Sequence, residues 1–171
     1  MKQDVMTISR HKQPPPAGAG ESARMWCLLC RCGAVLCALP VEQIVEIMRP
    51  LPVERIAGAP AYVRGLSVIR GVPVPVVDLG LIVGEHATLS VRLIAVKAAS
   101  RIVAVTVDWV LGISAIAADA LGQLPPLLRD TAPDTVAAIG ATDKELIIFL
   151  QTARLVPEDV LAGLNVKMPA S

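Results

Sequence analysis

From residue 25 onward, apolar residues fall into short runs that end at glycine, proline or polar turns. Val and Ile dominate these runs, which is typical of β-strands. The segments predicted to be strands are Met25–Leu39 (two strands broken at Arg31–Gly33), Leu66–Ile69, Val72–Leu79, Arg92–Val96, Ile102–Val107, Trp109–Ile113, Val136–Ala141 and Leu146–Leu150. The last two should form a hairpin. Uninterrupted apolar runs predict strands covered on both faces, as where two barrels pack together, so we expect a mainly β, barrel-type fold.

One early segment follows a helical period instead. After Pro40, which suits the first turn of a helix, apolar residues recur at Val41, Ile44, Ile47 and Met48. The pattern predicts one early helix, ended by Pro50 and Pro52. A short closing helix is predicted within Gln151–Leu164.

The first 23 residues differ in composition from the rest of the chain. They contain three consecutive prolines, Pro14–Pro16, followed by A-G-A-G. Such a segment cannot build a packed element, so residues 1–23 are predicted to be a flexible tail.

Composition argues against several classes of function. Sixteen Lys and Arg against fifteen Asp and Glu leave a net charge of +1, whereas nucleic-acid-binding domains usually carry a clear basic excess. Aromatic residues make up 2% of the chain, too few for base-stacking platforms. No apolar run reaches the roughly 18 residues that a membrane span needs, and no secretion signal is visible. These features predict a soluble, cytoplasmic protein.

Four cysteines lie close together, at Cys27, Cys30, Cys32 and Cys37. C-x-x-C spacing can indicate zinc or redox chemistry, but no histidine is near and the segment is predicted to be extended. By alternation along a strand, Cys30 and Cys32 should share one face, and Cys27 and Cys37 the other. We interpret the thiols as small core hydrophobes, with metal or redox chemistry as the minor alternative.

Residues that could carry catalysis are scarce. The two histidines, His11 and His86, fall in the tail and in a predicted loop, and no nucleophile-elbow, phosphate-loop or zinc-protease motif occurs. Asp78 and Asp108 each end a strand, where a carboxylate can accept hydrogen bonds from turn amides. We therefore expect no catalytic residues, no metal and no cofactor, and a structural role for both aspartates.

The most informative segment runs from Val63 to Gly80. A strand leads into a tight Arg70–Gly71 turn, and a second strand follows that carries Pro73 and Pro75. Glycine permits the backbone torsions of a hairpin corner, and prolines in a strand predict an edge or a bulge. Arg70 would then be a long, permanently charged side chain at the rim of this corner. It could either form part of a docking surface for another protein or be a solvated turn residue.

This segment, Y-V-R-G-L-S-V-I-R-G-V-P-V-P-V-V-D-L-G, resembles the central signature of the CheW-like family of chemosensory adaptors. Three further pieces resemble the family in the same order: L-P-V-E-Q-I-V-E-I, I-V-A-V-T-V-D-W-V-L-G-I and I-G-A-T-D-K-E-L-I-I-F-L-Q-T-A-R-L-V. The resemblance covers about 130 residues, from roughly Met25 to Val156. Together with the composition, it leads us to expect a flexible tail at 1–23, a CheW-like domain at 24–157, and a helix end and tail at 158–171.

The resemblance implies two small SH3-like five-stranded barrels around a shared core, and a scaffold without enzymatic activity. Its expected partners are the regulatory domain of a CheA-type histidine kinase and the cytoplasmic tips of chemoreceptors, in arrays on the inner face of the membrane. Family roles carry over to Ile44 and Glu46 in kinase binding, and to Val68, Arg70 and Gly71 at the receptor and kinase interface.

Alternative functions stay open from the sequence. Within the same class, the adaptor could serve pilus motility or another chemosensory-like pathway. From a different class, the chain could be a small-ligand or nucleic-acid-binding β-barrel, and an enzyme with an unrecognised site is the third alternative.

Overall fold

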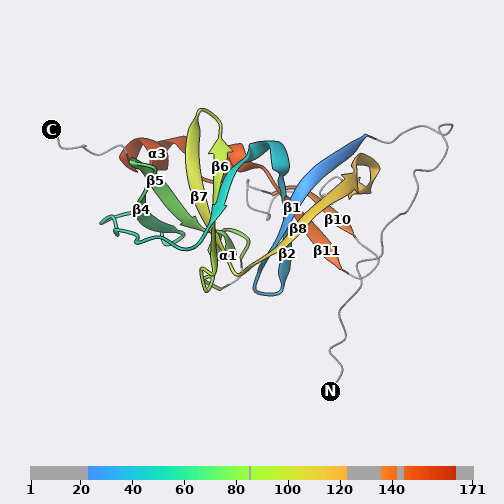
Figure 1. Ribbon diagram of the computed structural model, residues 1–171, viewed down its shortest axis with the longest axis horizontal. Helices are drawn as coiled ribbons and strands as arrows, with labels where there is room; N and C mark the ends of the chain where they lie inside the picture. Colours follow the sequence, from blue (N-terminus) through green and yellow to red (C-terminus); the bar gives the residue numbers. More distant parts are fainter. Residues whose placement is uncertain (1–22, 85, 123–135, 142–144, 165–171) are drawn as a thin grey trace, which may run out of the picture.

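The molecule is built from two β-sheets that lie side by side along its long axis (Figure 1). This computed structural model describes residues 23–84, 86–122, 136–141 and 145–164, and the structural statements below refer to those residues. All of the predicted tail except Ala23 lies outside the described residues.

The first sheet is formed by the two ends of the described chain. Its strands are β1 (Arg24–Cys32), β2 (Val35–Pro40), β8 (Trp109–Ala117), β9 (Leu121–Gly122), β10 (Val136–Ala141) and β11 (Leu146–Leu150). They lie in the order β8-β1-β2-β11-β10-β9. Neighbours are antiparallel except β2 and β11, and the predicted hairpin of β10 and β11 is confirmed.

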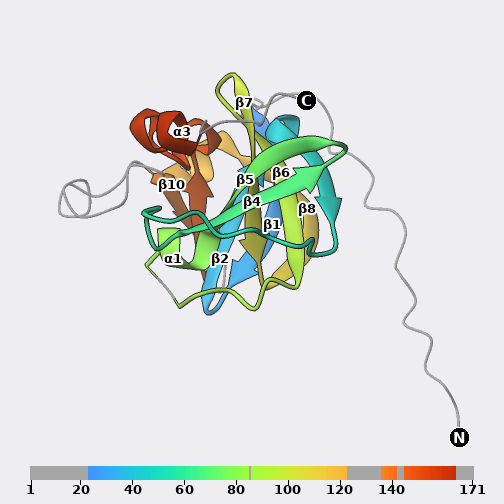
Figure 2. The same cartoon turned by 90° about the vertical axis from the view of Figure 1, so that its left-hand side faces the viewer.

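The second sheet is formed by the middle of the chain. Its strands are β3 (Ile44–Met48), β4 (Val63–Ile69), β5 (Val72–Asp78), β6 (Arg92–Ala98) and β7 (Arg101–Val107). They lie in the order β3-β6-β7-β5-β4, with β5 and β7 parallel. Figure 2 views this sheet from its end and shows how strongly it curls.

Buried side chains form three clusters, which explains why so many strands are apolar on both faces. One cluster, with Phe149, lies within the first sheet, and another, with Leu93, lies within the second. The largest takes residues from both sheets, including Leu39, Val77 and Val105. The expected fold of two small barrel-like units around a shared core is confirmed, with β9 as an added sixth strand in the first unit.

The predicted early helix is wrong. Only Val41–Gln43 forms a single 3₁₀ turn (η1), and the next residues form β3, which pairs with β6. Two of the four apolar positions, Ile44 and Met48, share one face of the strand, whereas Val41 lies in the 3₁₀ turn and Ile47 is exposed. The β-branched residues of I-V-E-I favour the strand. Pairing with β6, distant in sequence, decides between the two.

Helices contribute little to the described fold. A four-residue helix, α1 (Leu79–Ile82), follows β5. The predicted closing segment contains a 3₁₀ turn, η3 (Thr152–Arg154), and the helix α3 (Glu158–Leu164); another 3₁₀ turn, η2 (Ala118–Ala120), follows β8. Leu155 and Leu161 from the closing segment are buried in the shared core.

All four cysteines are buried free thiols, as expected for core hydrophobes. Their predicted distribution over the two faces is wrong, however, because Cys37 lies directly opposite Cys30 and shares the core cluster of Cys30 and Cys32. The two-residue turn between β1 and β2 pairs even-numbered with odd-numbered residues, so alternation along one strand does not extend across the turn. Only Cys27 faces the other cluster.

The strand that carries Pro73 and Pro75 is not an edge strand over its whole length. β5 pairs with β4 throughout, but β7 pairs only with Val76–Asp78. The half of β5 that contains the two prolines therefore has a partner on one side only. On its unpaired side, a missing amide donor costs no ladder hydrogen bond.

Candidate protein-binding surface

The turn between β4 and β5 is a tight two-residue hairpin. Ile69 pairs with Val72, and the two residues between them, Arg70 and Gly71, have φ angles of 49° and 79°. Positive φ at both central positions defines a type I′ turn, whose twist matches that of paired strands. Glycine adopts such torsions freely, whereas arginine is strained there, so the hairpin holds Arg70 in a fixed and unusual position.

Arg70 forms an ion pair with Glu46, which lies on β3. Its Nε donates a hydrogen bond to Oε2 of Glu46 over 2.8 Å. The Arg70 side chain is 79% exposed and the Glu46 side chain 32% exposed. The hydrogen bond from Arg70 holds the pKa of the Glu46 carboxyl below its ordinary value, and the same bond raises the pKa of Arg70. Both groups are therefore charged at neutral pH.

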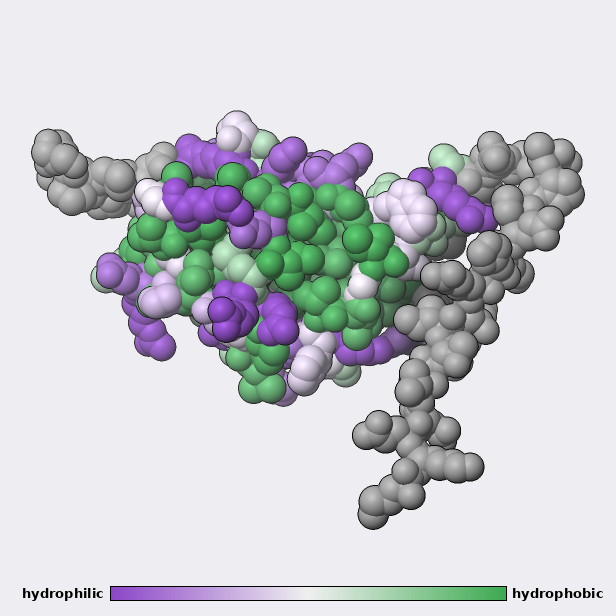
Figure 3. Space-filling model, viewed as in Figure 1, coloured by the Kyte–Doolittle hydropathy of each residue, from purple (hydrophilic) through white to green (hydrophobic). Residues whose placement is uncertain are grey.

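Exposed apolar side chains occur on the two elements that carry this ion pair. Val68 and Val72 are exposed on the hairpin, and Val45 and Ile47 are exposed on β3. Figure 3 shows that apolar residues cover much of the middle of the face on which β3, β6 and β7 are seen in Figure 1. We call the surface formed by Val45, Glu46, Ile47, Val68, Arg70 and Val72 the hairpin surface. Arginine is enriched among the hot spots of protein interfaces, which are surrounded by contacts that exclude water.

The structure brings the predicted site residues together, with one difference in their exposure. Glu46, Val68, Arg70 and Gly71 reach the surface, but Ile44 packs partly against the shared core. The exposed apolar positions of β3 are its neighbours Val45 and Ile47, which the sequence analysis did not select. Reading I-V-E-I as an alternating strand would have identified them, because the two faces of a strand differ in burial.

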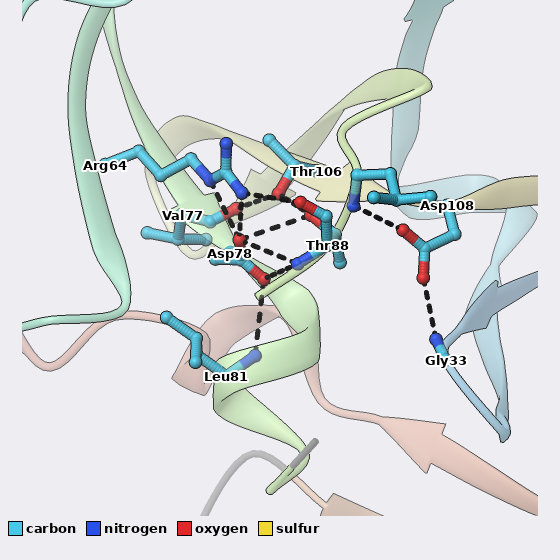
Figure 4. Close-up of polar contacts among 9 residues, drawn as sticks. Gly33, Arg64, Val77, Asp78, Leu81, Thr88, Thr106 and Asp108 are labelled. Atoms are coloured by element: carbon cyan, nitrogen blue, oxygen red, sulfur yellow. Dashed lines mark hydrogen bonds and ion pairs between the residues drawn. The ribbon is translucent and has the colours of Figure 1, made fainter. Parts of the chain in front are cut away.

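A buried carboxylate supports the hairpin from within the second sheet (Figure 4). Asp78, fully buried, accepts hydrogen bonds from Nε of Arg64 over 2.8 Å and from the amide of Thr88 over 3.1 Å. Its Oδ1 also accepts from the amide of Leu81 and caps α1. The Thr88 hydroxyl contacts that of Thr106 on β7 over 2.7 Å. The structural role expected for Asp78 is confirmed.

Asp108 connects the two sheets at the point where the chain passes from β7 to β8. Its carboxylate accepts a hydrogen bond from the amide of Gly33 over 2.7 Å and one from the amide of Leu89 over 2.6 Å. Gly33 belongs to the β1–β2 turn of the first sheet, and Leu89 lies in the segment that leads to β6 of the second. The structural role expected for this aspartate is also confirmed.

The described residues offer little that could carry out chemistry. An open groove of about 610 Å³ is lined by Arg55, Arg64, Asp78 and apolar residues of the 53–63 segment. The Asp78 carboxylate in this groove already accepts hydrogen bonds from Arg64, Thr88 and Leu81. Within the described ranges, no group of three His, Cys, Asp or Glu residues is placed to hold a metal ion, and His86 is exposed on a loop. None of the helices in those ranges has the length and apolar character needed to cross a membrane.

Two barrel-like units on one core, with an exposed ion pair on the second sheet, define the class of the molecule as a two-unit, β-rich domain. The chain matches the CheW-like domain family over residues 27–160. The chain therefore belongs to the CheW-like family, which places it among the adaptor and scaffold domains of chemotaxis signalling.

Two known proteins illustrate this relationship. The chain is 23% identical over 147 residues to the chemotaxis protein CheW of Klebsiella aerogenes, an alignment that covers 84% of this chain and 89% of that one. It also superimposes on the crystal structure of the scaffolding protein TtCheW from Thermoanaerobacter tengcongensis with a TM-score of 0.67 at 22% identity. That superposition covers 75% of this chain and 90% of the other and supports the fold.

Proposed function

We propose that this chain is a non-catalytic coupling scaffold that binds the regulatory domain of a CheA-type histidine kinase and the cytoplasmic tips of chemoreceptors. The observation that carries the proposal is the Glu46–Arg70 ion pair, held on the surface by a type I′ turn. Membership of the CheW-like family supports the class of partner. In this role the protein works in receptor arrays on the inner face of the membrane.

Within this function, Ile44 and Glu46 are proposed to act in kinase binding. Ile44 packs against the shared core and so fixes β3, while Glu46 presents a carboxylate to solvent. Val45 and Ile47, the residues before and after Glu46 on β3, are exposed apolar side chains that a partner can cover. Burial of such side chains supplies affinity, and the charge selects the partner.

Val68, Arg70 and Gly71 are proposed to form the receptor and kinase interface at the hairpin tip. Val68 is exposed. A Cβ built on Gly71 would have no neighbouring atom within 4 Å, so the space beside this glycine is open. A partner can therefore approach the backbone of the turn closely. The remaining donors of Arg70 can then pair with an acceptor on the partner, because Glu46 engages its Nε.

The test measures binding of the full chain to a purified kinase regulatory domain and to a soluble receptor fragment. Arg70→Ala and Glu46→Ala should each weaken binding of one or both partners by about thirtyfold, the effect of losing a hot-spot side chain. Arg154→Ala, which removes an exposed arginine from η3, is the matched control and should bind both partners normally.

Circular dichroism of each variant separates loss of binding from loss of folding. Folded Arg70→Ala and Glu46→Ala variants that bind both partners at full strength would refute the assignment of these residues. A wild-type chain that binds neither partner would refute the function itself.

A further inference from the structure

Among the strands that the structure describes, β8 lies at one edge of the first sheet. Within the described residues its only strand partner is β1, so its other side carries no ladder. Its nine residues, W-V-L-G-I-S-A-I-A, include no charge and no proline. Natural proteins usually protect sheet edges with charged residues, prolines or bulges, because an open edge pairs readily with another strand.

Only the C-terminal half of β8 is regular enough to accept another strand. The register against β1 shifts at Leu29 and Cys30, opposite Val110 and Gly112, and this bulge disturbs the N-terminal half. From Ile113 to Ala117, pairing with β1 is continuous. The bulge thus protects one half of the edge and leaves residues 113–117 open.

Exposed apolar side chains lie on and beside this open half. Ile113 is 60% exposed, and Trp26, which pairs with Ala115 from the neighbouring strand, is also 60% exposed. Cross-strand partners project from the same face of a sheet, and so do residues two apart on one strand. Trp26, Ile113 and Ala115 therefore form one apolar area along the edge, and Ala115 is its small residue.

We infer that β8 pairs antiparallel with β8 of a second copy of this chain, about a two-fold axis that passes through Ala115. The pairing joins the two first sheets into one continuous sheet. The inference is independent of the proposed kinase and receptor interface, because none of the residues of the hairpin surface takes part.

The sequence of the open half is complementary to itself in this register. Ile113 lies opposite Ala117 of the second copy, Ser114 opposite Ile116, and Ala115 opposite its own counterpart. Each large side chain thus meets a small one, and no like charges face each other across the axis. On the other face, Ile116 already packs against the core of the first sheet, so the strand is held in place for pairing.

Trp26 makes the second copy a better occupant than an unrelated strand. In the dimer, the two Trp26 rings flank the pair of alanines at the axis and can cover them from both sides. Two exposed apolar side chains per copy, Trp26 and Ile113, make a much smaller contact than the ~800 Å² per partner of a standard stable interface. We therefore expect a weak, reversible dimer rather than a permanent one.

The first experiment follows the mass of the full chain by light scattering and sedimentation over a wide concentration range. The wild type should pass reversibly from monomer to dimer. Ala115→Lys places two like charges opposite each other at the axis, and Ile113→Lys removes the apolar contact; each should raise the dimer dissociation constant by about tenfold or more. Leu146→Lys changes an equally exposed apolar strand residue on β11 and should have no effect.

Fluorescence gives a second readout at the proposed axis. The chain has two tryptophans, so Trp109→Phe leaves Trp26 as the only indole. Its emission should shift to shorter wavelength as the dimer forms, because pairing removes the ring from water. The Ala115→Lys change in the same background should abolish that shift.

Cross-linking tests the register itself, and it applies even where a lysine variant fails to fold. In Ala115→Cys, the new thiols face each other across the axis, and a mild oxidant such as a small disulfide takes two electrons and two protons as the sulfur–sulfur bond forms. This variant should cross-link much faster than Leu146→Cys. A wild type that stays monomeric at every concentration, a dimer insensitive to both lysine changes, or equal cross-linking rates would overturn the inference.

Discussion

Arg70 lies 24 residues from Glu46 in the sequence, yet its Nε is 2.8 Å from Oε2 of that carboxylate. Glu46 belongs to β3 and Arg70 follows β4, and these are the first and last strands in the order of the second sheet. The sheet curls until its two edge strands approach each other, and the ion pair joins them at the surface. One interaction thus both reports the curl of the sheet and displays a fixed charge pair to partners.

The titration of Glu46 should reflect this contact. The folded pKa of its carboxyl is depressed by the hydrogen bond from Arg70, so the ionised pair is complete above the ordinary range of Glu, about 4.3, and is lost as pH falls through the folded pKa. NMR of the carboxyl carbon should give a midpoint below the ordinary value in the wild type. In Arg70→Ala the midpoint should rise toward that value, and in Arg154→Ala it should not move; an unchanged midpoint in Arg70→Ala would contradict the pairing in solution.

Replacement of Asp78 should destabilise the protein strongly. Its fully buried carboxylate balances the charge of Arg64 and accepts the amide of Thr88. Asp78→Ala leaves a guanidinium and an amide without their partner, and breaking a buried pair in this way costs about 3–5 kcal/mol. Urea unfolding followed by circular dichroism measures the loss of free energy of unfolding.

A surface ion pair provides the control for that experiment. Nη2 of Arg31 lies 2.7 Å from each carboxylate oxygen of Glu145, but both side chains are about a third exposed. Glu145→Gln should therefore change the free energy of unfolding by about 1 kcal/mol or less. Equal losses in Asp78→Ala and Glu145→Gln would show that burial does not set the cost of breaking these pairs.

Two glycines of the β4–β5 hairpin should respond very differently to alanine. A Cβ on Gly65 would lie 1.9 Å from the carbonyl oxygen of Glu54, at a φ of 142°. Glu54 and Leu66 exchange backbone hydrogen bonds of 2.8 and 2.9 Å, so the carbonyl cannot move without breaking them. We expect Gly65→Ala to cost about 3 kcal/mol or more through the clash and the strained backbone together.

A Cβ on Gly71, by contrast, would have no neighbouring atom within 4 Å, so Gly71→Ala is destabilising only through the positive φ of 79°. The expected cost is about 1 kcal/mol. Thermal unfolding of both variants tests the pair of predictions. A larger loss at Gly71 than at Gly65 would mean that the close approach of residue 54 to β4 does not exist in solution.

The parts of the fold that depend on local sequence could be predicted from it. β-branched runs closed by turns located most of the strands, and the Arg70–Gly71 dipeptide located the type I′ corner. The hydrogen bonds of Asp78 and Asp108 to loop amides also follow from a short acidic side chain at a strand end. In each of these cases the structure depends on residues that are close in sequence, or on a side chain that needs only a nearby backbone amide as its partner.

The features that were missed depend on pairing between distant segments. A helix was predicted at β3 because four apolar positions recur at helical spacing, and it is the ladder with β6 that selects the strand. The Glu46–Arg70 contact could not be predicted because it requires the whole second sheet to curl. Cys37 was assigned to the wrong face because the cross-strand register, not its own strand, determines its neighbours.

The thiols of the first sheet should be unreactive in the folded protein. Burial raises the pKa of Cys27, the hydrogen bond with Cys37 raises that of Cys32, and the hydrogen bond with Cys30 raises that of Cys37. Only the thiolate is nucleophilic, so a raised pKa and zero exposure both slow its reaction. At neutral pH, a chromogenic disulfide reagent should titrate none of the four thiols in the native state and all four in urea. The rate of labelling should follow the unfolded fraction, so Asp78→Ala should label faster than the wild type while Glu145→Gln labels at nearly the wild-type rate. Rapid labelling of the folded wild type would contradict the burial of these residues and would revive a redox role for the cluster.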